Sequence, residues 1–178
     1  MEDFRFKHLI LGDSTVGKTS LTIKYISGSF LEDLRLTIGV DFYNKSLIYN
    51  DKRVRLQIWD FAGEQRFRFL LPKYCKGANS AFFLYDITKL TSLEHLPDWL
   101  TIIRKSEGDI PIVLIGSKLD LHEERKVSRD EGIKAASKYN LSSYIELSSK
   151  TGENVEEAFR IMTKILLERF KPYKEEVE

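Results

Sequence analysis

Along most of the chain, short apolar runs alternate with longer segments that mix apolar and polar residues. The run at residues 80–86 is apolar throughout, which is typical of a strand covered on both faces, as in a parallel sheet, and residues 110–117 predict the next buried strand. Residues 4–11 and 143–148 predict the first and the last strand. Residues 40–49 and 53–60 predict two further strands, and their short polar connection predicts an antiparallel hairpin.

The segments outside these strands carry helix signals. Helices are predicted at residues 19–27, 67–76, 92–107, from the cap at 128 to about 139, and from 154 onward. Pro97 should cut or kink the third of these helices. Ser128 and Glu131 form a capping-box pattern, and Asn154 is predicted to cap the last helix in the same manner. The last helix carries one apolar stripe, which we expect in the core: Val155, Ala158, Phe159, Met162 and Leu166.

This order of elements predicts an α/β fold with three layers. We expect a six-stranded, mostly parallel sheet with one antiparallel edge strand and with helices on both faces. The length of 178 residues favours a single domain spanning residues 1–178, with residues 171–178 as a short polar tail. In such sheets, ligands bind at the carboxyl ends of the strands.

Composition excludes several classes of protein. The net charge of +1, from 28 basic and 27 acidic residues, provides no broad basic surface, so we expect no nucleic acid partner. The single cysteine, Cys75, excludes an intrachain disulfide and fits a reducing compartment. No apolar run approaches the ~20 residues of a transmembrane helix. We therefore expect a cytoplasmic protein, which partners could bring to the periphery of a membrane.

The C-terminus provides a further expectation. It ends in KPYKEEVE, without the cysteine that a prenylated ending requires. Either the protein carries no lipid at this end, or the sequence has been cut short.

A phosphate-binding pattern follows the first strand. Gly12, Gly17, Lys18 and Thr19 form G-x-x-x-x-G-K-T between a predicted strand and a predicted helix, the context that this motif requires. The glycines let the loop turn its N–H groups inward, and the helix N-terminus favours an anion. Lys18 adds a positive charge for phosphates, and Thr19 offers a hydroxyl to Mg²⁺. The pattern predicts a P-loop NTPase fold, against the alternative of an ordinary glycine-rich turn.

Taken together, five motifs resemble those of the small GTPases of the Ras superfamily, and the Rab branch most closely. They occupy residues 12–20, 37–42, 59–66, 117–120 and 148–150, within a resemblance that covers about residues 5–170. The resemblance implies a GTP-binding molecular switch of vesicle trafficking that hydrolyses GTP with Mg²⁺. It also implies a monomer that meets effectors, exchange factors and GTPase-activating proteins.

The resemblance further assigns roles to individual residues. Thr19 and Thr37 would bind Mg²⁺ directly, and Asp60 would bind it through a water. Asp120 would read guanine, with Phe30 and Lys118 against the base. The full set implied to bind the nucleotide is Ser14, Thr15, Val16, Gly17, Lys18, Thr19, Ser20, Phe30, Thr37, Asp60, Gly63, Ser117, Lys118, Asp120, Ser148, Ser149 and Lys150. The implied effector surface is Ile38, Phe42, Trp59 and Tyr74, although Phe42 and Trp59 could also be plain hairpin packing.

The chain departs from the family pattern at two places. Ser117 stands where the family has asparagine, which should weaken a bridge between base and P-loop by about 1 kcal/mol without loss of guanine selectivity. Glu64 and Gln65 stand in exchanged order, and an ionised glutamate cannot donate a hydrogen bond to orient the attacking water. The implied catalytic set is Lys18, Thr37, Gly63, Glu64 and Gln65.

These departures leave several readings of catalysis open. Intrinsic hydrolysis should be slow, unless Gln65 takes over after a one-residue shift or Glu64 acts as a base. A non-hydrolysing, GTP-bound adaptor is the second reading. A P-loop kinase is a third, but it would need an arginine-rich lid that is not evident. No arginine stands out as an internal finger, and Arg35, Arg66 and Arg68 are expected at the surface.

Overall fold

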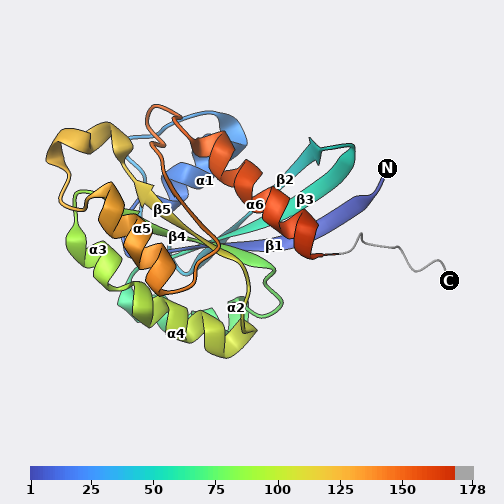
Figure 1. Cartoon of the computed structure of the whole chain (residues 1–178), viewed down its shortest axis with the longest axis horizontal. Helices are drawn as coiled ribbons and strands as arrows, with labels where there is room; N and C mark the ends of the chain where they lie inside the picture. The colour runs from blue at the N-terminus through green and yellow to red at the C-terminus, as the bar shows by residue number, and fades with distance from the viewer. Residues whose placement is uncertain (171–178) are drawn as a thin grey trace.

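A six-stranded sheet forms the middle layer of the molecule (Figure 1), in a computed structural model that describes residues 1–170. The strands are β1 (Asp3–Leu11), β2 (Val40–Tyr49), β3 (Lys52–Phe61), β4 (Ser80–Asp86), β5 (Ile112–Ser117) and β6 (Ser143–Glu146). Their order is β2-β3-β1-β4-β5-β6, and only the edge strand β2 runs antiparallel to its neighbour. The predicted fold class is confirmed, while the predicted tail at residues 171–178 lies outside the described residues.

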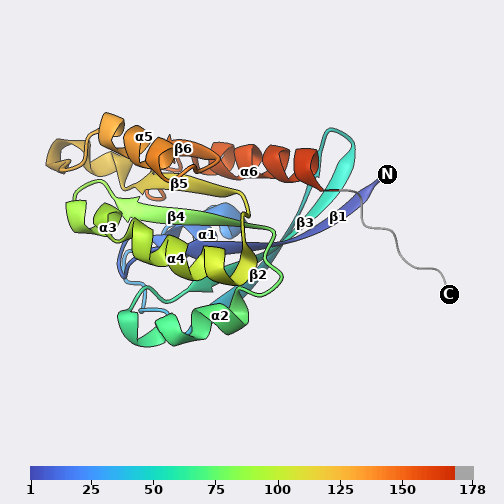
Figure 2. The ribbon, with the colours of Figure 1, turned by 60° about the horizontal axis from the view of Figure 1, so that its bottom comes forward.

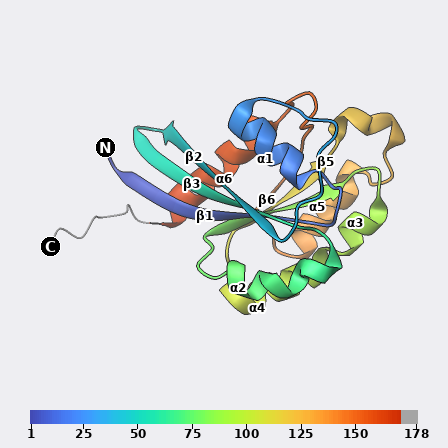
Figure 3. The same ribbon diagram turned by 180° about the vertical axis from the view of Figure 1, so that it is seen from behind.

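Helices cover both faces of this sheet (Figures 2 and 3). The α-helices are α1 (Lys18–Ser27), α2 (Leu71–Tyr74), α3 (Leu90–Glu94), α4 (Leu96–Glu107), α5 (Arg129–Lys138) and α6 (Val155–Arg169), and η1 (Gln65–Leu70) and η2 (Leu119–Glu124) are 3-10 helices. One apolar core lies beneath α1 and α6, and a second lies beneath α2 to α5. Within the described part of the chain, none of these helices has the length and apolar character needed to cross a bilayer.

Two proline positions decide how the predicted helices divide. The helix predicted at residues 92–107 is broken at His95, with Pro97 near the start of α4, as its sequence indicates. The helix predicted at residues 67–76 is wrong in type over its first half, which is the 3-10 helix η1. Pro72 is in the first turn of α2, so the α-helical turn starts only there.

The two predicted capping boxes differ in outcome. Ser128 and Glu131 make both hydrogen bonds of the box, so the start of α5 is confirmed. The box predicted at Asn154 is wrong, because this residue is left-handed (φ 61°) and its side chain does not cap α6. Its amide instead donates to the carbonyl of Glu146 at 2.8 Å and so holds the end of β6. The predicted apolar stripe of α6 is buried in the core as expected.

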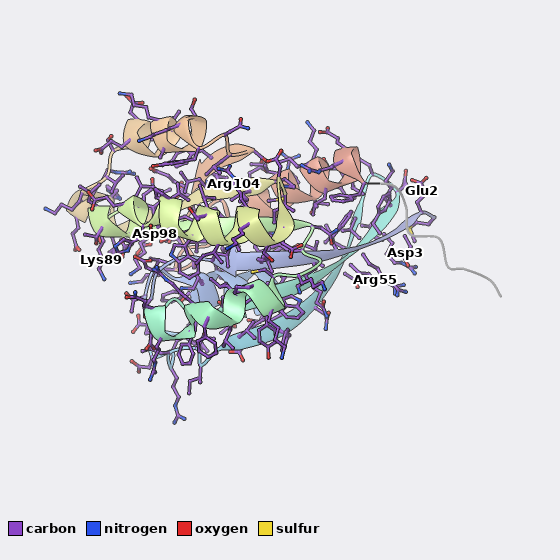
Figure 4. The ribbon with its side chains drawn as sticks, turned by 90° about the horizontal axis from the view of Figure 1, so that it is seen from below. Glu2, Asp3, Arg55, Lys89, Asp98 and Arg104 are labelled. Atoms are coloured by element: carbon purple, nitrogen blue, oxygen red, sulfur yellow. The ribbon has the colours of Figure 1, made fainter. Side chains whose placement is uncertain are left out.

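The two ends of the sheet carry different chemistry. At one end, Asp3 on β1 pairs with Arg55 on β3 at 2.9 Å, and Figure 4 shows both far from Lys89 at the other end. Because β1, β3, β4, β5 and β6 run parallel, their carboxyl ends meet at the Lys89 end. The sequence motifs that follow these strands therefore converge on one edge.

Candidate functional site

A cavity of about 460 Å³ opens at the carboxyl edge of the sheet. Its walls come from the P-loop, the segment after α1 and the loops after β3, β5 and β6. Most of the residues predicted to bind a nucleotide line it: Ser14, Thr15, Val16, Gly17, Lys18, Thr19, Ser20, Phe30, Thr37, Gly63, Ser117, Lys118, Asp120, Ser149 and Lys150. Asp60 and Ser148 are fully buried and are not among the lining residues. The structure thus brings together five segments that are far apart in sequence.

The P-loop has the backbone shape that its glycines predict. Gly12 has φ 141°, and a Cβ at this position would come within 2.4 Å of the Leu84 carbonyl oxygen. Gly17 has φ 99° and directly precedes α1. Thr15 also has a positive φ of 67°, a conformation that costs a side-chain-bearing residue free energy. The loop is therefore held in a strained shape at the N-terminus of a helix, where anions bind.

Lys18 is a buried cation at the base of the cavity. Its Nζ donates to the carbonyl oxygen of Asp13 at 2.6 Å, and only 6% of the residue is exposed. Burial lowers the pKa of Lys18 to about 8, although the charges of Asp60 and Asp13 oppose the shift. A buried ammonium is costly without an anionic partner, and a phosphate in the cavity would supply one.

Three oxygen-bearing side chains meet beside Lys18. The Thr19 hydroxyl lies 2.9 Å from the Thr37 hydroxyl and donates to Oδ2 of Asp60 at 2.5 Å. Burial raises the pKa of Asp60 to about 6, and its Oδ1 has no hydrogen-bond partner among residues 1–170. Hydroxyl and carboxylate oxygens are the ligands that Mg²⁺ prefers. Oδ1 of Asp60, which has no hydrogen-bond partner in the described part of the chain, is available to interact with a bound ion. This donor set therefore fits Mg²⁺.

Carboxylate and imidazole groups alone would not hold that ion. No cluster of three or more His, Cys, Asp or Glu suited to a metal exists among the described residues. A cation at this place would therefore depend on the two threonine hydroxyls and on phosphate oxygens, as Mg²⁺ does in sites shared with a nucleotide.

The loop after β3 lies directly on the P-loop. A Cβ on Gly63 would come within 2.2 Å of the Asp13 carbonyl carbon and of the Ser14 nitrogen. The N–H of Ala62 donates to the Gly39 carbonyl at 2.8 Å, which joins this loop to the segment that carries Thr37. Movement of one loop must therefore disturb the other.

Glu64 and Gln65, the exchanged pair, differ in position. Glu64 lines the cavity, and its Oε2 lies 2.7 Å from Nε of Arg66. Gln65 is exposed and is not among the residues that line the cavity. Of the two residues, Glu64 is therefore the one that contributes to the cavity wall. The catalytic roles given to both residues stay predictions.

On the far side of the cavity, Ser117 joins β5 to the P-loop. Its hydroxyl oxygen lies 2.6 Å from the Val16 carbonyl and 2.8 Å from the Tyr85 carbonyl, and its one hydrogen can serve only one of them at a time. Ser117 thus makes a direct link to the P-loop, the connection that its short side chain was expected to weaken.

Asp120 and Lys118 are each fixed by a neighbouring strand end. The Ser148 hydroxyl donates to Oδ1 of Asp120 at 2.7 Å, so this serine orients the carboxylate from behind the cavity wall. Lys118 Nζ lies 2.8 Å from Oδ2 of Asp86 at the end of β4. Both side chains are therefore held before any ligand arrives.

Three of the four predicted effector residues, Phe42, Trp59 and Tyr74, form one aromatic cluster. Phe42 meets Trp59 edge to face, with ring centroids 4.4 Å apart, and Trp59 lies 5.9 Å from Tyr74. Lys7 places its ammonium 3.6 Å from the centre of the Trp59 ring. Phe42 is 51% exposed and Ile38 is 79% exposed. Phe42 and Trp59 pack on the hairpin, and exposed apolar area remains at Phe42 and Ile38. Hairpin packing and a role in effector binding are therefore compatible.

A cluster centred on Asp13 was not predicted from the sequence. The carboxylate of Asp13 lies 2.5 Å from Nδ1 of His95, accepts from Nε1 of Trp99 at 3.1 Å and lies 3.6 Å from Arg68. Arg68 also stacks over the Trp99 ring at 4.8 Å. With 21% of its side chain exposed, Arg68 is partly buried, so its predicted surface position is wrong. The P-loop position of Asp13 was the only available signal, since nothing in the sequence pairs it with His95.

Comparison with known proteins agrees with this geometry. The family model described as "Ras family" matches residues 7–168. Human Ras-related protein Rab-19 is 40% identical over 168 residues, which cover 94% of this chain and 77% of that protein. Ras-related protein Rab-2B of Dictyostelium discoideum is 43% identical over 165 residues, with 92% and 81% covered. Rab-19 of Xenopus laevis is 40% identical, with 94% and 79% covered.

Proposed function

Since this chain belongs to the Ras family and resembles its Rab members, we propose that it is a slow, GTP-hydrolysing switch that recruits effectors through two loops. The loops are the Thr37 segment and the Gly63 segment. One observation carries the proposal: Thr19, Thr37 and Asp60 meet beside the buried Lys18. This group offers oxygen ligands and a positive charge to the phosphate end of a nucleotide.

The mechanism follows from where each side chain lies. Lys18 and the N–H groups at the start of α1 stabilise charge on the β- and γ-phosphates. Thr19 and Thr37 would hold Mg²⁺ directly and Asp60 would hold it through a water, and the ion would neutralise part of the phosphate charge. Water would attack the γ-phosphate in line with the leaving group, and we assign Glu64, which lines the cavity, to accept a hydrogen bond from that water.

The guanine end is read by fixed hydrogen-bonding groups. Asp120, held by Ser148, accepts from the N1–H and 2-amino groups of guanine. Adenine lacks this pair of donors, so it would leave the carboxylate unsatisfied. Lys118 lies along the base, and Ser149 and Lys150 offer backbone N–H groups from the loop after β6.

Switching then depends on the contact between the two loops. With GTP bound, Thr37 would hold Mg²⁺ and the Thr37 and Gly63 loops would contact the γ-phosphate, so loss of that phosphate on hydrolysis would release both loops. The effector surface of Ile38, Phe42, Trp59 and Tyr74 lies on and beside these loops, so its shape follows the nucleotide. We further propose a monomer that exchange factors and GTPase-activating proteins regulate and that partners bring to membranes.

A second candidate function is a GTP-bound adaptor that does not hydrolyse. The placement of Glu64 in the cavity wall and the exposure of Gln65 favour it, because Gln65 does not line the cavity in which the attacking water would have to be oriented. Identifying the nucleotide bound to the freshly purified protein is a simple way to distinguish the hydrolysing switch from the adaptor. Bound GTP would favour the adaptor, and bound GDP would favour the switch.

The decisive experiment is single-turnover GTP hydrolysis at saturating Mg²⁺, with the natural protein compared with Glu64→Gln. A slow natural protein that the substitution accelerates would support restraint by Glu64. A natural rate that is already ordinary for Ras proteins, and that the substitution hardly changes, would refute the slow-hydrolysis proposal. Competition between GTP and ATP tests the base-binding role of Asp120, and equal affinities would refute that role.

A further inference from the structure

Glu64, in the cavity wall, forms an ion pair with Arg66. It precedes η1, and Arg66 within η1 turns back so that its Nε lies 2.7 Å from the Glu64 carboxylate. The glutamate side chain is 25% exposed, whereas that of Arg66 is 68% exposed. Glu64 thus lines the cavity with most of its side chain covered, whereas most of the Arg66 side chain is exposed to solvent.

The other carboxylates at this end of the cavity also have partners. Asp13 contacts His95 and Arg68, and Asp60 accepts from the Thr19 hydroxyl. These groups hold negative charge that would otherwise repel an approaching phosphate. Asp60 also lies close enough to the Lys18 ammonium for their charges to interact, and Asp13 lies beside Arg68. Without Arg66, Glu64 would therefore be the member of these three carboxylates with no neighbouring cation among the described residues.

We propose that Arg66 makes Glu64 compatible with a third phosphate, and so determines how strongly the site prefers GTP over GDP. The inference rests on the proposed function. GDP ends one phosphate earlier, so the charge of Glu64 bears mainly on GTP. Arg66 acts through Glu64 and is therefore a positioning residue. Its ion pair lies at the surface, where such pairs add little to the stability of the fold.

The size of the effect follows from Coulomb's law. Two unit charges about 6 Å apart interact by roughly 1 kcal/mol at the high effective dielectric of a partly exposed site. Loss of Arg66 should therefore weaken GTP binding roughly three- to ten-fold relative to GDP binding. The effect should shrink at high ionic strength, because solvent-exposed charges are screened.

The test measures dissociation constants for GDP and for a non-hydrolysable GTP analogue, at low and high salt. The variants are Arg66→Gln, Arg66→Lys, Glu64→Gln and the double substitution, and Lys73→Gln is the matched control. Lys73 is an exposed cation on α2, so its loss changes the net charge equally without touching Glu64. Folding of each variant is checked by its thermal unfolding.

We expect Arg66→Gln to weaken binding of the analogue roughly three- to ten-fold while GDP binding stays within about two-fold. Arg66→Lys should retain most of the preference. The double substitution of Glu64→Gln with Arg66→Gln should restore the preference for the GTP analogue over GDP, because a neutral amide at position 64 needs no counter-charge. Lys73→Gln should behave as the natural protein.

Two outcomes would overturn the inference. One is an unchanged ratio of GTP to GDP affinity in Arg66→Gln. The other is a loss that persists in the double substitution, which would mean that Arg66 acts through its contact with the Phe67 ring at 4.7 Å and not through Glu64. Failure of the proposed function gives a different result, because the natural protein would then bind neither guanine nucleotide in preference to its adenine counterpart.

Discussion

A buried histidine makes the stability of this protein depend on pH. His8 on β1 is fully buried, and its Nδ1 lies 2.7 Å from the Ser80 hydroxyl on β4. The ring of Phe82 meets it edge-on at 4.3 Å, and its Nε2 has no partner within residues 1–170. Burial lowers the pKa of His8 from 6.5 to about 3, so the folded protein keeps this ring neutral.

The sign and size of the effect follow from proton linkage. Below pH 6.5 the unfolded chain binds a proton at His8 and the folded chain does not, so acid favours unfolding. Each pH unit costs about 1.4 kcal/mol, so His8 should lower the free energy of unfolding by about 2 kcal/mol between pH 6.5 and 5.0. The loss would approach about 5 kcal/mol near pH 3.

Asp60 titrates in the opposite sense, so a comparison of variants is required. Its pKa is raised to about 6, so the folded state takes up this proton first, which stabilises the fold as the pH falls towards 4. The difference between the natural protein and His8→Phe cancels this contribution. His8→Phe leaves the Ser80 hydroxyl unpaired, a roughly constant cost of about 1–3 kcal/mol that His8→Phe with Ser80→Ala removes.

The assay is urea unfolding at constant ionic strength and excess GDP, followed by tryptophan fluorescence between pH 7.5 and 5.0. His8 is not among the residues that line the cavity, so the variants should share the same ligand contribution. We expect the natural protein to lose about 2 kcal/mol relative to His8→Phe over this range. A difference that does not vary with pH would refute the reasoning.

Three further substitutions test the site and the fold. Gly63→Ala should weaken binding of a GTP analogue roughly tenfold more than binding of GDP, because a Cβ would lie 2.2 Å from the P-loop backbone and force the loop away. An unchanged ratio of the two affinities would contradict the close packing. Ser117→Ala should speed GDP release roughly fivefold through loss of its hydrogen bond to the P-loop, and an unchanged rate in stopped-flow fluorescence would argue against that link. Ser128→Ala should lower the free energy of unfolding by about 1 kcal/mol while nucleotide affinity stays constant, since the capping box lies on α5 away from the cavity; chemical denaturation and nucleotide titration measure the two quantities.

Local patterns in the sequence were sufficient for most of the architecture. The fully apolar run at β4 and the alternation of strands with helices identified a mostly parallel sheet, because burial on both faces requires apolar side chains throughout. The spacing of Gly12, Gly17 and Lys18 predicted the P-loop, because its backbone shape depends on neighbouring residues. The capping box at Ser128 and the break before Pro97 are likewise interactions within a few residues.

Only the tertiary structure decided which side chains meet across the chain. The cluster of Asp13 with Arg68, His95 and Trp99 joins positions more than fifty residues apart, and no local pattern specifies such a pairing. Asn154 could have capped α6, but its backbone is left-handed and its side-chain amide donates to the Glu146 carbonyl, so the side chain is held at the end of β6. The sequence alone determined that Glu64 and Gln65 are exchanged. Which of the two lines the cavity was decided by the tertiary structure: Gly63 packs against the P-loop, and this contact fixes the path of the loop after β3, so that Glu64 is the lining residue.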